Sequence, residues 1–255
     1  MTNNITYPQQ ISNLGPKVWY KFDETAGTPI NSGSLSTTAT FNNLLLNEQT
    51  DVNGRSVYFN GTDSSISLGN YSAFSLFDDK SFTVETWFQE TGTNTGDKYL
   101  WWFGPNSSTN FLSLKMAAGT GQITATLING GSTYNINSTT NTYNDDKWHH
   151  AVVTVNTTSL KLYLNGQLQG TATLPTGSLT GWDNTGSKII GNYLSSYWKG
   201  RIDEFAIYDR ELTGSEILSN FNSGSAVNLL DIPGYATALM VMPTNTTQTI
   251  LTAAP

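Results

Sequence analysis

The chain has 255 residues, a formal net charge of -7 and a charged fraction of 12%, about half of the ~25% usual in a globular domain. It contains no cysteine, which excludes disulfide bonds, thiolate metal sites and a cysteine nucleophile. Serine, threonine and asparagine make up roughly a third of the residues, so neutral side chains supply most of the polarity. The few basic residues are scattered, which gives no electrostatic footprint for nucleic acid or an anionic membrane.

The N-terminal segment, residues 1–20, has no basic region followed by an apolar run and therefore does not look like a secretory signal. No stretch approaches the ~18 apolar residues needed to span a bilayer. If Met1 is the native start, we expect a soluble protein made in the cytosol, without membrane insertion. The alternative is a chain whose export signal has been removed.

Short runs with period-two alternation, rich in aromatic and β-branched residues, recur along the chain and predict a dozen strands joined by turns. They cover residues 17–22, 55–60, 65–69, 82–89, 111–116, 122–128, 133–137, 148–156, 159–166, 170–175, 187–192 and 201–210. Asn165-Gly166 separates two of these runs, and both residues tolerate the positive φ of a tight hairpin turn. The pattern predicts an all-β, antiparallel two-sheet sandwich.

One helix is predicted near the end of the sandwich, at about residues 213–222. Thr213 and Glu216 have the spacing of a capping box ahead of an apolar run, and Gly224 is placed to end the helix.

The chain divides into an N-terminal arm, residues 1–16, a sandwich domain, residues 17–225, and a C-terminal tail, residues 226–255. The tail is too apolar for a flexible solvated linker. We expect it to pack back on the domain or to dock on a partner.

Several motifs, taken together and in order, resemble the laminin-G-like, concanavalin A-like lectin/glucanase domains. They are "VWYKFDETAGTPINSGS", "SVYFNGTDSSISLGN", "FTVETWFQ", "KWHHAVVTVNTTSLKLYLNGQ" and "WKGRIDEFAIYDRELTGSEI", spread over roughly residues 17–225. The resemblance implies a jelly roll of two curved antiparallel sheets, one of them often facing a ligand. It fixes no activity, because this fold carries lectins, adhesins, enzyme-attached binding modules and virion proteins.

The two histidines of the chain, His149 and His150, are adjacent on a predicted strand. Neighbouring side chains on a strand point to opposite faces, so the two imidazoles are not expected to bind one ion together. No third histidine is present to complete a zinc site, although a carboxylate would serve. We interpret both as structural residues at the start of a strand.

Glycoside hydrolysis needs two carboxylates across a sugar bond. The resemblance implies that the glucanase branch takes them from alternate positions of one strand. Here Arg201 stands where the first acid would be, Asp203 and Glu204 are expected on opposite faces, and Glu85 is alone on its face. The sequence therefore disfavours a hydrolase and predicts a protein that is not an enzyme.

Calcium is the cofactor that the resemblance implies, as a structural or ligand-bridging ion. Asp23, Glu24 and Asp203 match acidic positions in the first and last strands of such domains, and these strands are often neighbours. The alternative is that Asp23 accepts backbone N–H groups in the turn that follows it and that Asp203 pairs with Arg201 or Arg210.

Sugar binding needs aromatic faces beside planar polar groups at an exposed site. Residues 181–186 and 191–200 combine these in apparent loops. The candidate carbohydrate contacts are Trp182, Asp183, Asn184, Asn192, Tyr193, Tyr197 and Trp198. The alternative is that Trp182 and Trp198 cap the core.

Residues 99–110 form a second aromatic candidate. Trp101 and Trp102 are adjacent on a strand and so face opposite sides, which places one of them in the core.

The sequence thus favours a non-enzymatic, lectin-like structural or adhesion protein that binds a cell-surface glycan. We expect it in a virion, as a phage capsid decoration or tail-associated component, with the tail contacting other structural chains or further copies of the same chain. One alternative is a carbohydrate-binding or adhesin module of a secreted bacterial protein, located outside the cell or on its surface. The other is a glycoside hydrolase.

Overall fold

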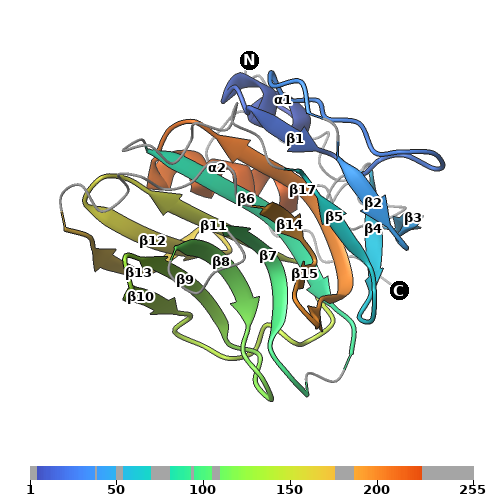
Figure 1. The fold of residues 1–255 in the computed structure, drawn as a ribbon. Coiled ribbons are helices and arrows are strands. Elements are labelled where there is room, and N and C mark those ends of the chain that lie inside the picture. The colour runs from blue at the N-terminus through green and yellow to red at the C-terminus, as the bar shows by residue number, and fades with distance from the viewer. Residues whose placement is uncertain are drawn as a thin grey trace, which may run out of the picture.

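The computed structural model describes residues 5–37, 39–49, 54–69, 81–92, 95–104, 110–175 and 187–225. Two antiparallel sheets lie face to face, and two helices cover part of the outer face of one sheet (Figure 1). This arrangement confirms the predicted jelly-roll sandwich. Each of the twelve predicted strands overlaps an observed strand.

The eight-stranded sheet has the order β13-β12-β11-β6-β17-β4-β3, with β1 paired to β17 off this path. Its strands are β1 (Val18–Tyr20), β3 (Leu45–Gln49), β4 (Arg55–Asn60), β6 (Phe82–Glu90), β11 (His149–Val155), β12 (Ser159–Leu164), β13 (Gln167–Thr173) and β17 (Lys199–Tyr208). Strands far apart in sequence are neighbours here, so β6 lies between β11 and β17. The turn from β12 to β13 holds Asn165 and Gly166 at φ 49° and 75°, as the sequence predicts.

The seven-stranded sheet has the order β10-β9-β8-β7-β14-β5-β2. Its strands are β2 (Thr40–Asn42), β5 (Ser65–Ser67), β7 (Lys98–Gly104), β8 (Phe111–Met116), β9 (Ile123–Asn129), β10 (Ser132–Asn137) and β14 (Ser187–Ile190). A separate two-stranded hairpin of β15 (Asn192–Tyr193) and β16 (Ser196–Tyr197) follows β14 and contacts β7. The sequence did not predict β2, β3, β15 or β16, which are short or irregular.

The main core fills the space between the two sheets. On β8, Leu112, Leu114 and Met116 are buried in it, while Phe111 and Lys115 alternate with them on the outer face. Each fully buried side chain of this size contributes roughly 1.5–3 kcal/mol. The alternation therefore fixes which side chains of the seven-stranded sheet face outward.

Helix α2 (Gly214–Ser225) confirms the predicted helix and runs three residues further than expected. The capping box is present, because Thr213 N–H donates to Glu216 Oε2 over 2.8 Å and Glu216 N–H donates to Thr213 Oγ1 over 3.3 Å. The prediction that Gly224 ends the helix is wrong. It lies inside α2 against the ring of Trp87, where a side chain would clash.

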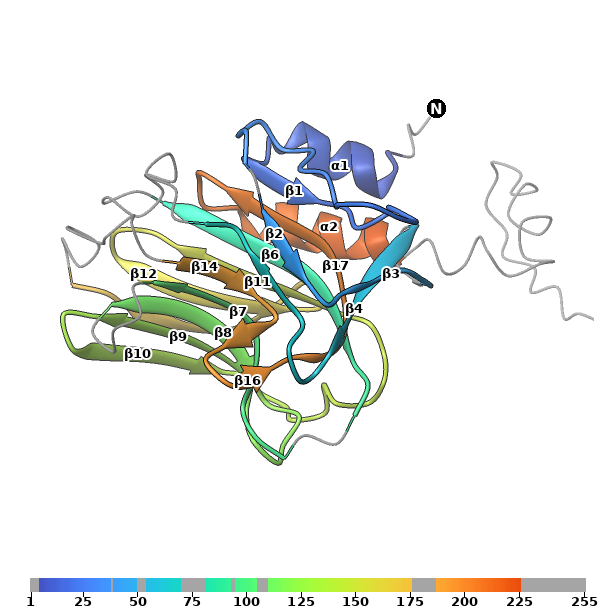
Figure 2. The same cartoon turned by 45° about the vertical axis from the view of Figure 1, so that its right-hand side comes forward.

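The N-terminal arm contains a second helix, α1 (Tyr7–Asn13), which the sequence did not predict. Helices α1 and α2 contact each other and lie near β1 and β17 (Figure 2). They bury a second apolar cluster against the outer face of the eight-stranded sheet. The cluster is made of Tyr7, Ile11, Trp19, Trp87, Val152, Tyr163, Ala206, Tyr208, Leu212 and Ile217.

Within the part of the chain that the structure describes, no helix is long and apolar enough to cross a membrane. The tail, residues 226–255, lies outside the described residues, so its predicted docking role stays a prediction.

Candidate functional site

The β15–β16 hairpin carries the described part of the predicted carbohydrate contacts. Its turn is tight, with Leu194 at φ 54° and largely exposed. Tyr193 pairs with Ser196, and Asn192 pairs with Tyr197. Because cross-strand partners share a face, Tyr193 and Tyr197 lie on opposite faces of the hairpin.

Tyr193 faces the seven-stranded sheet and joins an aromatic cluster there. Its ring stacks 4.7 Å from the Trp102 ring and lies 5.1 Å from Tyr99 and 6.2 Å from Phe111. We call these four residues, Tyr99, Trp102, Phe111 and Tyr193, the hairpin surface. Tyr99, Phe111 and Tyr193 are partly exposed, and Trp102 is buried beneath them.

Hydroxyl and amide side chains continue the hairpin surface across the outer face of the sheet. Ser113 of β8 is paired with Trp102, Thr126 of β9 with Ser113, and Asn135 of β10 with Thr126. Asn135 is exposed. An aromatic patch therefore lies directly beside a row of neutral donors and acceptors.

Trp102 Nε1 and Ser113 Oγ, under the hairpin surface, are buried and have no hydrogen-bond partner in the part of the chain that the structure describes. Buried polar groups are nearly always paired with protein, ordered water or a ligand. An indole N–H only donates, whereas a hydroxyl both donates and accepts. The two atoms together suit a ligand that carries hydroxyl groups.

The far edge of the hairpin surface carries one ion pair. Lys115 Nζ binds Asp97 Oδ2 and lies 5.8 Å from the centre of the Tyr99 ring. Burial, followed by the charge of Asp97, raises the pKa of Tyr99 to about 12. The Tyr99 hydroxyl is therefore neutral at physiological pH and is able to donate a hydrogen bond.

The other predicted contacts have different positions. Trp198 is fully buried in the main core, with its ring edge-on to Phe88 at 5.7 Å, so we leave it out of the proposed contact surface. Trp182, Asp183 and Asn184 lie outside the described residues.

The two histidines point to opposite faces, as the sequence predicts. His149 Nε2 lies 2.8 Å from Asp145 Oδ1. His150 is fully buried beside Trp87, and its Nε2 lies 2.7 Å from Glu85 Oε1. Both have structural contacts, which agrees with the interpretation as structural residues.

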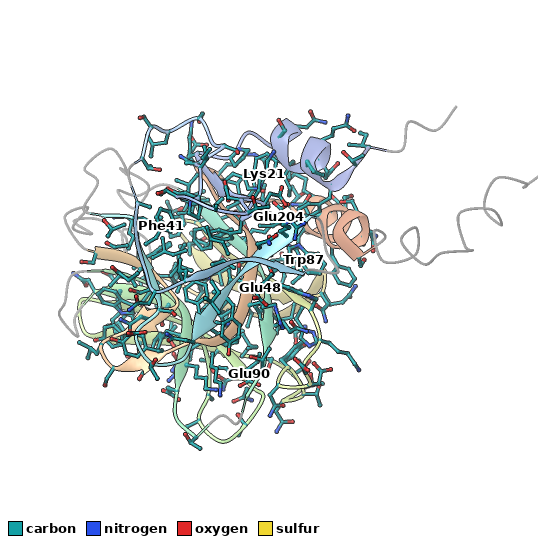
Figure 3. The ribbon with its side chains drawn as sticks, turned by 90° about the vertical axis from the view of Figure 1, so that its right-hand side faces the viewer. Lys21, Phe41, Glu48, Trp87, Glu90 and Glu204 are labelled. Atoms are coloured by element: carbon teal, nitrogen blue, oxygen red, sulfur yellow. The ribbon has the colours of Figure 1, made fainter. Side chains whose placement is uncertain are left out.

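The acids of the hydrolase alternative lie under the helices. Glu85 accepts hydrogen bonds from His150, Tyr208 and Asn220, and Glu204 accepts one of 2.6 Å from Trp19 Nε1. In Figure 3 the labelled Trp87 and Glu204 lie beside the two helices.

The prediction that Asp203 and Glu204 point to opposite faces is wrong. Asp203 is the cross-strand partner of Trp87 and so lies on the same face of the sheet. The pairing of β17 with β6 then shifts between Asp203 and Ala206, and Glu204 has φ 50°. This bulge turns Glu204 toward the face where Trp87 lies.

The three acids of the calcium prediction each have a backbone partner. Asp23 Oδ1 accepts Arg55 N–H at 2.9 Å, Glu24 Oε1 accepts Ile30 N–H at 2.8 Å, and Asp203 Oδ1 accepts the N–H of the next residue at 2.9 Å. Among the described residues, no three histidine, cysteine, aspartate or glutamate side chains form a group that would hold a metal ion. Calcium stays a prediction.

A laminin-G-type family model, described as the concanavalin A-like lectin/glucanases superfamily, matches residues 60–218. The chain belongs to this superfamily. No curated protein matches the chain. The superfamily includes binding domains and glucanases, so membership alone leaves the activity open.

Solved structures of similar fold include a domain of an arabinanase and parts of botulinum neurotoxins. Domain 4 of AbnA, an extracellular arabinanase from Geobacillus stearothermophilus in complex with arabinotriose, is 20% identical, with a TM-score of 0.60, over 80% of this chain and 97% of that domain. A structure from botulinum neurotoxin type C is 16% identical, with a TM-score of 0.64, over 84% of this chain. Cell entry of this neurotoxin is described as dependent on interaction with two ganglioside molecules. The binding domain of botulinum neurotoxin DC in complex with rat synaptotagmin II is 15% identical, with a TM-score of 0.65, over 83% of this chain.

The chain spans 52% of each of the two neurotoxin chains. At these identities the likeness concerns the fold.

Sequence reasoning placed Trp102 in a second candidate patch, but it did not connect Tyr99, Trp102 and Phe111 with Tyr193. The three come from β7 and β8, and the hairpin that brings Tyr193 to them is far along the chain. Alternation on β8 places Phe111 outward, so a signal for one of them was present.

Proposed function

We propose that the chain is a non-enzymatic, lectin-like module that binds a cell-surface glycan through the hairpin surface. The observation that carries this proposal is a pair of buried atoms beneath partly exposed Tyr193. Trp102 Nε1 and Ser113 Oγ have no hydrogen-bond partner among the described residues. Aromatic faces with a few convergent polar groups are the usual make-up of a ligand site. The sheet supplies them on rigid strands.

The burial of the acids supports a binding role over hydrolysis. Glu85, Asp203 and Glu204 are fully buried, and Asn220 of α2 donates a hydrogen bond to Glu85. A glycosidase needs its two carboxyl groups beside the scissile bond of a bound sugar. A sugar at the surface of this fold therefore does not reach these three carboxyl groups.

The solved neighbours also support a saccharide ligand. One is described in complex with arabinotriose, and another with a dependence on two ganglioside molecules. Both ligands carry sugar rings rich in hydroxyl groups, the chemistry that the hairpin surface suits.

A glycan array tests the proposal with a matched pair of variants. Tyr193→Ala removes the ring that stacks on Trp102, whereas Tyr197→Ala removes the same side chain from the opposite face of the same hairpin. We expect wild type and Tyr197→Ala to bind the same glycans and Tyr193→Ala to lose at least about tenfold in affinity. An array with no bound glycan, or equal loss in both variants, contradicts the proposal.

Calcium is a proposed cofactor of this function, as a structural or ligand-bridging ion near Asp23, Glu24 or Asp203. The carboxylate oxygens of these residues are hard ligands of the type that Ca²⁺ prefers. Running the array with calcium and with a chelator tests it, and identical glycan binding in both argues against a ligand-bridging ion.

We further propose that the module acts in an assembly, either a virion or a cell surface, with the tail as its docking segment. The weakly charged surface and the apolar tail, residues 226–255, support this role. Deletion of residues 228–255 is expected to leave the sandwich folded and to abolish assembly, as measured by light scattering. A truncated chain that assembles normally rejects the docking role.

A further inference from the structure

A polar pocket lies on the outer face of the eight-stranded sheet, away from the hairpin surface. It is a shallow, open pocket with a volume of about 430 Å³, within the roughly 300–1,000 Å³ range of ligand sites. Its lining residues come from β3, β4, β17 and two loops. They are Leu45, Glu48, Tyr58, Thr91, Asp146 and Arg201. We call it the Arg201 pocket.

The guanidinium of Arg201, which lines this pocket, is held in place by its neighbours. Its Nη1 donates to Gln89 Oε1 over 2.8 Å, and its Nη2 and Nε donate to Glu48 Oε2 over 3.1 and 3.3 Å. Its Cζ lies 5.8 Å from the centre of the Tyr58 ring. A guanidinium fixed on three sides loses little freedom when a ligand binds.

The loop wall is tied to the same network. Gln89 Nε2 donates to the backbone oxygen of Asp146 over 2.8 Å, which joins the loop to the residue that binds Arg201. Asp146 is exposed and has φ 58°. The pocket is therefore shaped by contacts within the protein before any ligand enters.

Hydrogen-bonding groups remain for a ligand. An arginine has five N–H donors, and Glu48 and Gln89 take three of those of Arg201. Thr91 Oγ1 is buried with no hydrogen-bond partner among the described residues. Acceptors come from the carboxylates of Glu48 and Asp146.

The charges in the pocket select the class of ligand. One cation, Arg201, faces two carboxylates, those of Glu48 and Asp146, so an anionic ligand is disfavoured. A hydroxyl group donates to a carboxylate and accepts from a guanidinium, so adjacent hydroxyls fit a site with both. The Tyr58 ring and exposed Leu45 add apolar surface at its edge.

We propose that the Arg201 pocket is a second saccharide site, which binds a neutral sugar unit. It rests on different residues from the hairpin surface and on the opposite sheet, so either site can fail without the other. If both bind, one module engages two saccharide chains or two parts of one, which raises the overall avidity without further contacts.

The test is an NMR titration that follows the Nε–H signal of Arg201 in the full chain. The chain has three arginines, Arg55, Arg201 and Arg210, so these signals are few, and Arg201→Lys assigns the relevant one by its loss. The probes are three neutral trisaccharides, arabinotriose, maltotriose and mannotriose, and one acidic trisaccharide, sialyllactose. The matched control is Arg55→Lys, whose position on β4 does not line the pocket.

We expect at least one neutral trisaccharide to move the Arg201 signal in wild type, in Arg55→Lys and in Tyr193→Ala. Arg201→Lys should weaken the binding of that trisaccharide about tenfold or more at this site, because a lysine cannot replace the forked contact. Glu48→Gln should also weaken it, which provides a second variant if Arg201→Lys fails to fold. The proposal is overturned if no neutral trisaccharide moves the signal, if only sialyllactose does, or if Tyr193→Ala abolishes the shift.

Discussion

Asn220 ties helix α2 to the buried carboxylate of Glu85, and its removal is expected to loosen the helix. Its Nδ2 lies 3.0 Å from each oxygen of Glu85, and both residues are fully buried. His150 and Tyr208 also contact this carboxylate. Glu85 is thus held by groups from two strands and one helix.

The perturbation is Asn220→Ala. A hydrogen bond to a charged group is worth about 1.5–3 kcal/mol, and the truncation also leaves a small cavity. We expect a loss of roughly 2–4 kcal/mol in the free energy of unfolding. For a domain of this size that lowers Tm by roughly 4–16 °C.

The matched control is Asn222→Ala, which changes the same residue type on the exposed side of α2. Both variants gain the same helix propensity, so it cancels in their difference. Urea unfolding followed by far-UV circular dichroism measures the two stabilities. Amide exchange is expected to rise in α2 more than in β6 or β11. The reasoning is refuted if the two variants differ by less than about 0.5 kcal/mol.

Two further predictions concern the ion pair between Arg210 and Glu216 and two glycines with positive φ. The hydrogen bond from Arg210 holds the pKa of Glu216 at about 2, below its ordinary 4.5, so this pair stabilises the fold above about pH 4.5 and the contribution is lost as the pH falls toward 2. Thermal melts should therefore show a smaller acid-induced fall in Tm for Glu216→Gln than for wild type. The difference should be modest because the ion pair is partly exposed. Parallel curves of Tm against pH would contradict this prediction. Gly191→Ala, at φ 82° with Phe59 in the way of a side chain, should cost about 2–4 kcal/mol, against about 1 kcal/mol for Gly130→Ala at φ 56° in open space. Equal losses in chemical unfolding would show that the contact with Phe59 does not matter.

The alternation of apolar and polar residues and the residues typical of turns predicted most of the fold. The strands at residues 82–89 and 148–156 were predicted from runs of β-branched and aromatic residues with period-two alternation in the sequence. In the structure nearly every residue of β6 and all of β11 are buried, so both faces of these two strands are covered. Helix α1 was missed although its sequence carries signals for a short helix. Thr6 and Gln9 have the capping-box spacing, and Tyr7 and Ile11 are four residues apart on the face that packs against the distant sheet.

The site could be predicted only in part. Tyr193 was named from its neighbours in sequence, but its partners Tyr99 and Trp102 lie on β7, and only the fold brings them together. The bulge at Glu204 was not predictable, since nothing in "GRIDEF" marks a positive φ at a glutamate.

The most direct test of glycan binding at the hairpin surface is the indole N–H signal of Trp102 during titration with the glycan that binds best on the array. Trp102 Nε1 is buried within the hairpin surface and has no hydrogen-bond partner among the residues that the structure describes. The proposed site predicts that this signal and the amide signal of Ser113 shift saturably in wild type and in Tyr197→Ala, but not in Tyr193→Ala. Unchanged Trp102 and Ser113 signals at a saturating glycan concentration would contradict the proposed site.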